Sequence, residues 1–153
     1  MARDRGSVSI EVAVLAPAFI GLMVLAGVAG RTAVADEAVE SAAHDAARAA
    51  SIARDARTGR TAATDAARRQ LDWSGLHCTA PPALTFRGSV GGEETSFRNA
   101  YRGAPGVPAT VTVTVTCTVS FDDLRARGLP LTLDGKTVSA SFTSPLDTYR
   151  SRG

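Results

Sequence analysis

An uninterrupted apolar run limits the fold of this chain more strongly than any other feature. It covers residues 12–30, has the sequence VAVLAPAFIGLMVLAGVAG and contains no charged side chain. As an α-helix it is about 28 Å long at 1.5 Å per residue, close to the ~30 Å hydrocarbon core of a bilayer. A helix inside a water-soluble protein rarely stays apolar around its whole circumference over such a length. The run therefore predicts one membrane-spanning helix.

The charges on either side of the run predict its direction in the membrane. Arg3 and Arg5 precede it, whereas Arg31 on the far side is soon followed by Asp36 and Glu37. Flanks rich in Lys and Arg tend to stay on the cytoplasmic side. We therefore expect a single-pass protein of the cell membrane, with a cytoplasmic N-terminus and an extracytoplasmic C-terminal part.

The residues just before the run carry a second pattern. Glu11 directly precedes it, at the edge of a region where a carboxylate is costly. Gly6 and Ser7 stand upstream, so that cleavage between them makes Glu11 the fifth residue of the mature chain. This arrangement resembles the class III signal of type IV pilins. There a prepilin peptidase, an intramembrane aspartic protease, cuts after the Gly on the cytoplasmic side and leaves the helix attached.

The resemblance narrows with Pro17, which stands six residues after Glu11. The segment SIEVAVLAP is similar to the start of TadE-like proteins of the tight-adherence pilus system, although Val12 replaces their usual aromatic residue. This resemblance implies a pilin-like fold and a structural role as a minor pilin or pseudopilin. Glu11 would then serve in recognition or subunit register. The implied partners are membrane lipid, the prepilin peptidase and other pilin-like subunits.

Two other interpretations of the N-terminus remain open. In the first, the leader is never processed, and the chain is a single-pass, membrane-anchored surface protein whose C-terminal domain binds a partner. In the second, Ala33-Val34-Ala35 is an A-x-A cleavage site, and a secreted protein starts at Asp36. The length of the apolar run argues against the second, since secretory signals have apolar regions of about 7–15 residues.

The chain from residue 31 to residue 72 is Ala-rich and predicts a helical stalk. Small residues recur at spacings of four and three, which gives a narrow stripe with strong helix propensity. Gly59 is expected to cap the first helix, and Thr61–Leu71 to form a second, shorter one. The stripe packs either within the subunit or against a neighbouring subunit. Its members are Ala35, Val39, Ala42, Ala46, Ala49, Ala53 and Ala56.

From residue 73 the composition shifts to Thr, Val, Pro and Gly, which predicts a small β domain. In Thr110–Phe121 apolar residues alternate with Thr and Ser, as in an antiparallel strand with one buried face. Asp134-Gly135 is a turn signal, and the tail from Ser144 is expected to fray. Further strands are expected at Ala83–Arg87, Leu129–Leu133 and Thr137–Thr143.

The predicted organisation is thus an α+β, pilin-like chain. It comprises a cytoplasmic leader with a prepilin-type signal (residues 1–11), a transmembrane helix (12–30), an Ala-rich helical stalk (31–72) and a small antiparallel β domain (73–153).

The two cysteines, Cys78 and Cys117, both follow the apolar run. If this part of the chain is exported, they are expected to form a disulfide, because oxidising compartments favour one. Closing a loop of this size stabilises the fold by about 4 kcal/mol in the chain-entropy model. Two unpaired thiols in a β domain are the alternative.

No pattern of catalytic or metal-binding residues emerges. His44 is flanked by Ser41 and Asp45 on a solvated helix face, where no catalytic triad is expected. His77 with the two cysteines lacks zinc-site spacing, and Asp122-Asp123 is interpreted as a strand-end turn. A net charge of +2 does not suggest nucleic-acid binding. We therefore predict no enzymatic activity, cofactor, metal, nucleic-acid partner or small-molecule substrate.

Overall fold

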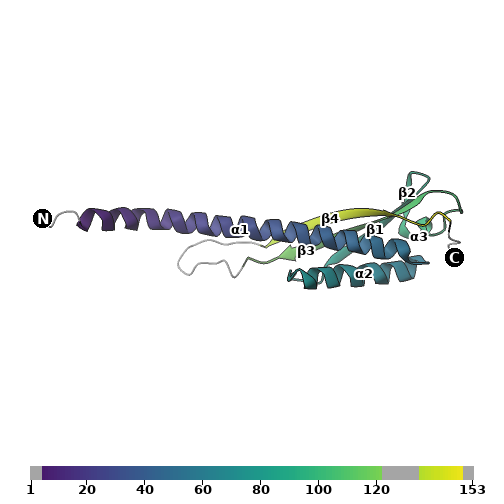
Figure 1. The fold of residues 1–153 in the computed structure, drawn as a ribbon, viewed down its shortest axis with the longest axis horizontal. Helices are drawn as coiled ribbons and strands as arrows, with labels where there is room; N and C mark the ends of the chain where they lie inside the picture. The colour runs from purple at the N-terminus through teal and green to yellow at the C-terminus, as the bar shows by residue number, and fades with distance from the viewer. Residues whose placement is uncertain (1–4, 122–134, 150–153) are drawn as a thin grey trace.

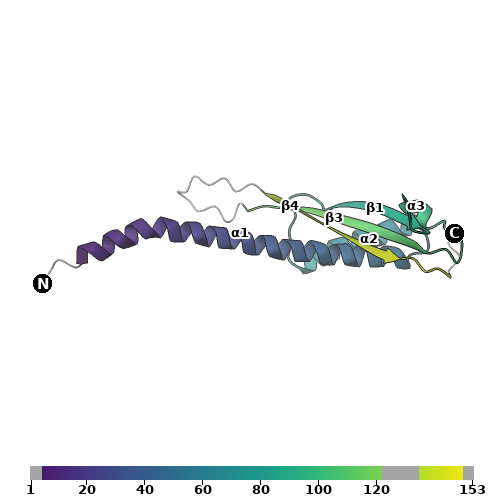
Figure 2. The ribbon, with the colours of Figure 1, turned by 90° about the horizontal axis from the view of Figure 1, so that it is seen from above.

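The computed structural model is an elongated molecule built around one long helix. It describes residues 5–121 and 135–149, with side chains from residue 12 onward. Helix α1 (Arg5–Ile52) contains 48 residues, and its N-terminal part projects from the folded domain, while α2 (Ala56–Trp73) runs back beside its C-terminal part (Figure 1). Figure 2 shows that the projecting part of α1 bends relative to the rest.

A four-stranded antiparallel sheet packs against these helices. Its spatial order is β2-β1-β3-β4, and the short helix α3 (Phe97–Ala100) connects β2 to the loop before β3. This arrangement confirms the α+β fold. The strands are β1 (Ala83–Val90), β2 (Glu93–Ser96), β3 (Ala109–Val119) and β4 (Lys136–Pro145).

Strand β3 confirms the alternating pattern. Its apolar side chains are buried against the helices, and its threonines lie on the opposite, partly exposed face. This outer face is held by hydroxyl pairs between β3 and β4, each 2.7–2.9 Å long, in which Thr112, Thr114, Thr116 and Thr118 meet Thr143, Ser141, Ser139 and Thr137. Cross-strand pairs of this kind fix the register of the two strands.

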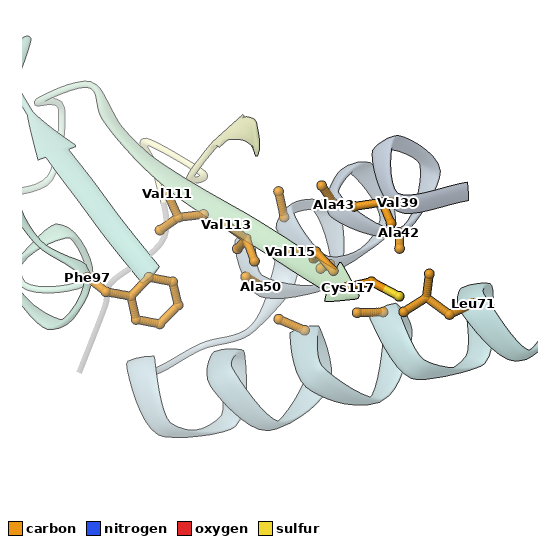
Figure 3. Packing of buried hydrophobic residues seen from close by; sticks show 14 of the residues in the cluster. Val39, Ala42, Ala43, Ala50, Leu71, Phe97, Val111, Val113, Val115 and Cys117 are labelled. Carbon is orange, nitrogen blue, oxygen red and sulfur yellow. The ribbon is translucent and has the colours of Figure 1, made fainter. Parts of the chain in front are cut away.

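The core is made of small side chains. Figure 3 shows Val111, Val113 and Val115 of β3 pointing toward α1 and α2. Because alanine lacks a bulky side chain, α1 can lie close to both the sheet and α2. The buried residues of α1 are Ala35, Ala38, Val39, Ala42, Ala43, Ala46, Ala47 and Ala50. The predicted stripe is therefore in part correct, but the buried face is wider because α1 is covered on two sides, within the subunit.

The expected cap at Gly59 is wrong. Helix α1 ends at Ile52, and the chain turns through residues 53–55 before α2 begins. Asp55 caps α2, since its Oδ1 accepts hydrogen bonds from the backbone N–H groups of Arg57 and Thr58, both 2.9 Å. Gly59 is buried in the first turns of α2, where an added Cβ would collide with the Tyr101 hydroxyl. The glycine at this position permits close contact with Tyr101 and does not end a helix.

The remaining strands agree with expectation in part. The strands expected at Ala83–Arg87 and Thr137–Thr143 are present within β1 and β4. Strand β2 was not expected; a turn at Gly91 and Gly92, both with positive φ, folds it onto β1. The fraying expected for the tail from Ser144 is wrong at Ser144 and Leu146, which are buried; residues 150–153 lie outside the described residues. Leu129–Leu133 and Asp134 lie outside the described residues.

Candidate functional site

The candidate site is the exposed apolar surface of α1. In folded domains large apolar side chains are normally buried, yet along this part of α1 they are exposed; Leu22, for example, is 61% exposed. The helix is long and apolar enough to cross a membrane, and none of its most apolar stretch is buried in the fold. The exposed residues are Val12, Val14, Leu15, Phe19, Ile20, Leu22, Met23 and Leu25. Lipid or other apolar helices are the surroundings that such a surface favours.

The residues of the expected processing signal lie at the start of this helix. The backbone is helical at Gly6, Ser7 and Glu11, in the first turns of α1. Pro17 lies inside the helix. Because proline has no N–H group, it cannot donate the usual hydrogen bond to the carbonyl four residues earlier, and this favours a bend.

Cys78 and Cys117 form a disulfide in the structure, as predicted, with a Cα–Cα distance of 5.4 Å. It joins the segment after α2 to β3. Beside it the backbone N–H of Thr79 donates to the Thr118 carbonyl oxygen at 2.8 Å. The two links hold the exit of α2 against the sheet.

The histidines make no catalytic arrangement within the described residues. The exposed ring of His44 lies 4.4 Å from that of Phe142, centroid to centroid, and its Nδ1 lies 3.3 Å from Oδ1 of Asp45. His77 adjoins Cys78, whose sulfur is bonded to Cys117, so neither sulfur is a free thiolate for a metal. No group of three metal-ligating residues occurs in the described ranges. Asp122-Asp123 lies outside them.

The structure also reveals a contact that the sequence pattern did not indicate. Tyr101 is buried at the far end of the domain, and its hydroxyl donates to the carbonyl oxygen of Ala50 near the C-terminus of α1. Burial, with a smaller contribution from the negative charge of Asp55, raises the pKa of Tyr101 to about 12. The pKa of Asp55 itself is lowered, chiefly by the hydrogen bond from the Thr58 backbone N–H.

The raised pKa of Tyr101 gives a testable pH dependence. The folded state disfavours tyrosinate, so this stabilisation is fully present below the ordinary pKa of about 10 and is lost as pH rises toward 12. We expect the thermal midpoint of the full chain in detergent to fall over this interval, and to fall less in Tyr101→Phe. Equal alkaline losses in both proteins would contradict this role of Tyr101.

A second unpredicted feature is a groove of about 480 Å³ where α1 enters the folded domain. Three segments that lie far apart in the sequence form it: the α1 turn at residues 30–34, the exit of α2 at residues 74–77, and the end of β3 at residues 119–120. Since no single segment carries the groove, no local pattern could have indicated it.

Comparison with known proteins agrees with the N-terminal pattern. The family model described as TadE-like protein matches residues 6–48, which include Gly6, Glu11, Pro17 and the whole apolar run. The match ends within α1, before α2 and the sheet. No curated protein and no solved structure matches the chain. Over residues 6–48, the N-terminal segment of this chain is thus similar to that of TadE-like proteins.

Proposed function

We propose that this chain is a structural component of a tight-adherence pilus, a membrane-anchored minor pilin or pseudopilin. One observation carries the proposal: the segment that matches the TadE-like family is also the helix whose apolar surface the fold leaves exposed. A helix of this kind can anchor the subunit in the bilayer and can pack against the helices of similar subunits. The partners that we propose are membrane lipid, the prepilin peptidase and other pilin-like subunits.

In this proposal the two ends of α1 lie on opposite sides of the membrane. The basic leader is cytoplasmic, where the peptidase cuts between Gly6 and Ser7, and the α2–sheet domain is extracytoplasmic. The disulfide supports this direction, because disulfides persist in oxidising compartments outside the cytoplasm. After cleavage, Glu11 can pair with the new α-amino group of its own chain or of a neighbour, where low dielectric strengthens the attraction.

The processing step has a direct test in the replacement Gly6→Leu. With the prepilin peptidase co-expressed, we expect the natural chain to lose residues 1–6 and Gly6→Leu to retain them, because a bulky side chain replaces the glycine of the signal. Intact-mass spectrometry of the membrane fraction distinguishes the two products.

A matched control uses the same replacement elsewhere on the helix. Gly21→Leu introduces the same side chain at a position where an added Cβ has no atom within 4 Å, so it should be processed normally. If Gly6→Leu also matures normally, the prepilin-type signal is wrong. If the natural chain itself keeps residues 1–6, an unprocessed surface protein that binds through its β domain is the favoured alternative.

A further inference from the structure

The position of the groove along α1 determines its depth relative to the bilayer. Helix α1 continues from the apolar run into the domain without a break, and the first fully buried side chain after the run belongs to Ala35. Arg31 and Val34 are one and four residues beyond Gly30, or about 1.5 and 6 Å along the axis. The headgroup layer on each side of a bilayer is about 5–8 Å thick. If the run spans the hydrocarbon core, this groove lies among the lipid headgroups.

The side chains that line the groove match the two parts of a phospholipid at that depth, its polar headgroup and its apolar chains. Arg31 and His77 supply nitrogen donors, and Ser74 and Ser120 supply hydroxyl groups. Val34, Leu76 and Val119 supply an apolar wall, and Val34 is 59% exposed although it is apolar. A guanidinium favours phosphate oxygens, and the apolar wall suits the glycerol and the upper acyl carbons.

We propose that this groove binds the headgroup of a phospholipid from the adjoining leaflet, with Arg31 on the phosphate and Val34 against the upper acyl chain. The domain then sits directly on the bilayer, and the bound lipid sets the height and tilt at which α1 leaves the membrane. The proposal rests on the membrane anchoring proposed above. Its test must therefore detect a failure of anchoring separately.

Depth-dependent fluorescence quenching provides this test in the full chain, reconstituted in vesicles of phosphatidylcholine and phosphatidylglycerol. Trp73 is the single tryptophan and is 84% exposed, so Trp73→Phe removes the native signal at little structural cost. In that background Val34→Trp reports on the groove, Leu22→Trp on the membrane interior and Ile52→Trp on the far end of α1.

Lipids with a nitroxide on the headgroup should quench Val34→Trp more strongly than lipids brominated in mid-chain. The order should reverse for Leu22→Trp, and neither lipid should quench Ile52→Trp. If Leu22→Trp is not quenched in mid-chain, the helix is not inserted and the anchoring itself fails. If Leu22→Trp is quenched but Val34→Trp is not, the chain is anchored and the groove proposal is overturned.

Native mass spectrometry of the full chain in detergent then tests the lipid contact. Titration with phosphatidylglycerol should give a bound lipid whose affinity falls about tenfold in Arg31→Gln, the usual effect of losing a charge-assisted hydrogen bond. Arg48→Gln, an exposed arginine on the same helix outside the groove, should leave the affinity unchanged. Equal losses in both variants, or displacement of the lipid by inorganic phosphate at equal concentration, would contradict a headgroup site.

Discussion

Replacing Leu22 by Arg is expected to release most of the protein from the membrane fraction. Leu22 lies near the middle of the apolar run and is exposed in the fold, so its surroundings are lipid if the run spans the bilayer. Exchanging a leucine for an arginine at the centre of a span costs about 3 kcal/mol of insertion free energy, or roughly a hundredfold in the insertion equilibrium. Resistance of the membrane fraction to carbonate extraction measures the effect.

The matched control is Ile52→Arg, which places the same charge at the opposite end of α1. Ile52 is also exposed, at 69%, but it is the last residue of α1 and follows the last buried residue of that helix, Ala50. It should therefore remain in the carbonate-resistant fraction. If Leu22→Arg is retained as well as Ile52→Arg, the apolar run does not hold the protein in the bilayer.

Removing the disulfide should have the largest effect on the stability of the folded domain. With both Cys78 and Cys117 replaced by Ala, we expect the free energy of unfolding to fall by about 2–5 kcal/mol, the usual cost of losing a native bridge in a small domain. The link also holds the exit of α2 on β3, so this edge of the domain should open first.

Thermal unfolding of the full chain in detergent, followed by circular dichroism, measures this loss. The midpoint should fall by at least about 8 °C, since 1 kcal/mol shifts the midpoint of a domain of this size by roughly 4–8 °C. Dithiothreitol should lower the midpoint of the natural chain but not that of the double variant. An unchanged midpoint in the double variant would show that the bridge contributes little.

The elements that were predicted correctly from the sequence are those whose pattern lies within one continuous segment of the chain. The apolar run and the alternation of Val and Thr in β3 each extend over enough residues to define a helix or a strand alone. The signal residues Gly6, Glu11 and Pro17 are recognised by spacing, and the family match covers the same segment.

The features that were missed depend on contacts between distant segments. The alanines of α1 do not indicate which face of the helix is buried, because alanine occurs on every face. Only the packing of α2 and the sheet shows which alanines are buried. Gly59 suggested a helix end, but the Tyr101 hydroxyl requires the glycine there. Strand β2 is polar and short, and it pairs only because the Gly91–Gly92 turn brings it onto β1.

The folded domain holds the exposed helix in a fixed direction. Packing of residues 35–50 on α2 and the sheet fixes the direction in which the apolar run leaves the domain. The apolar run is thus a continuation of the helix whose C-terminal part belongs to the core. Such a design suits the proposed role, in which the helix holds a subunit in the membrane before or during pilus assembly.

The central claim is that the leader is removed while the helix stays attached and anchors the chain. The most direct test is the intact mass of the protein from carbonate-washed membranes of cells that carry the pilus machinery. We predict a single mature species in the membrane fraction that begins at Ser7. A chain that begins at Asp36 and appears in the soluble fraction would contradict the whole claim, and a membrane-bound chain with an intact leader would contradict the processing.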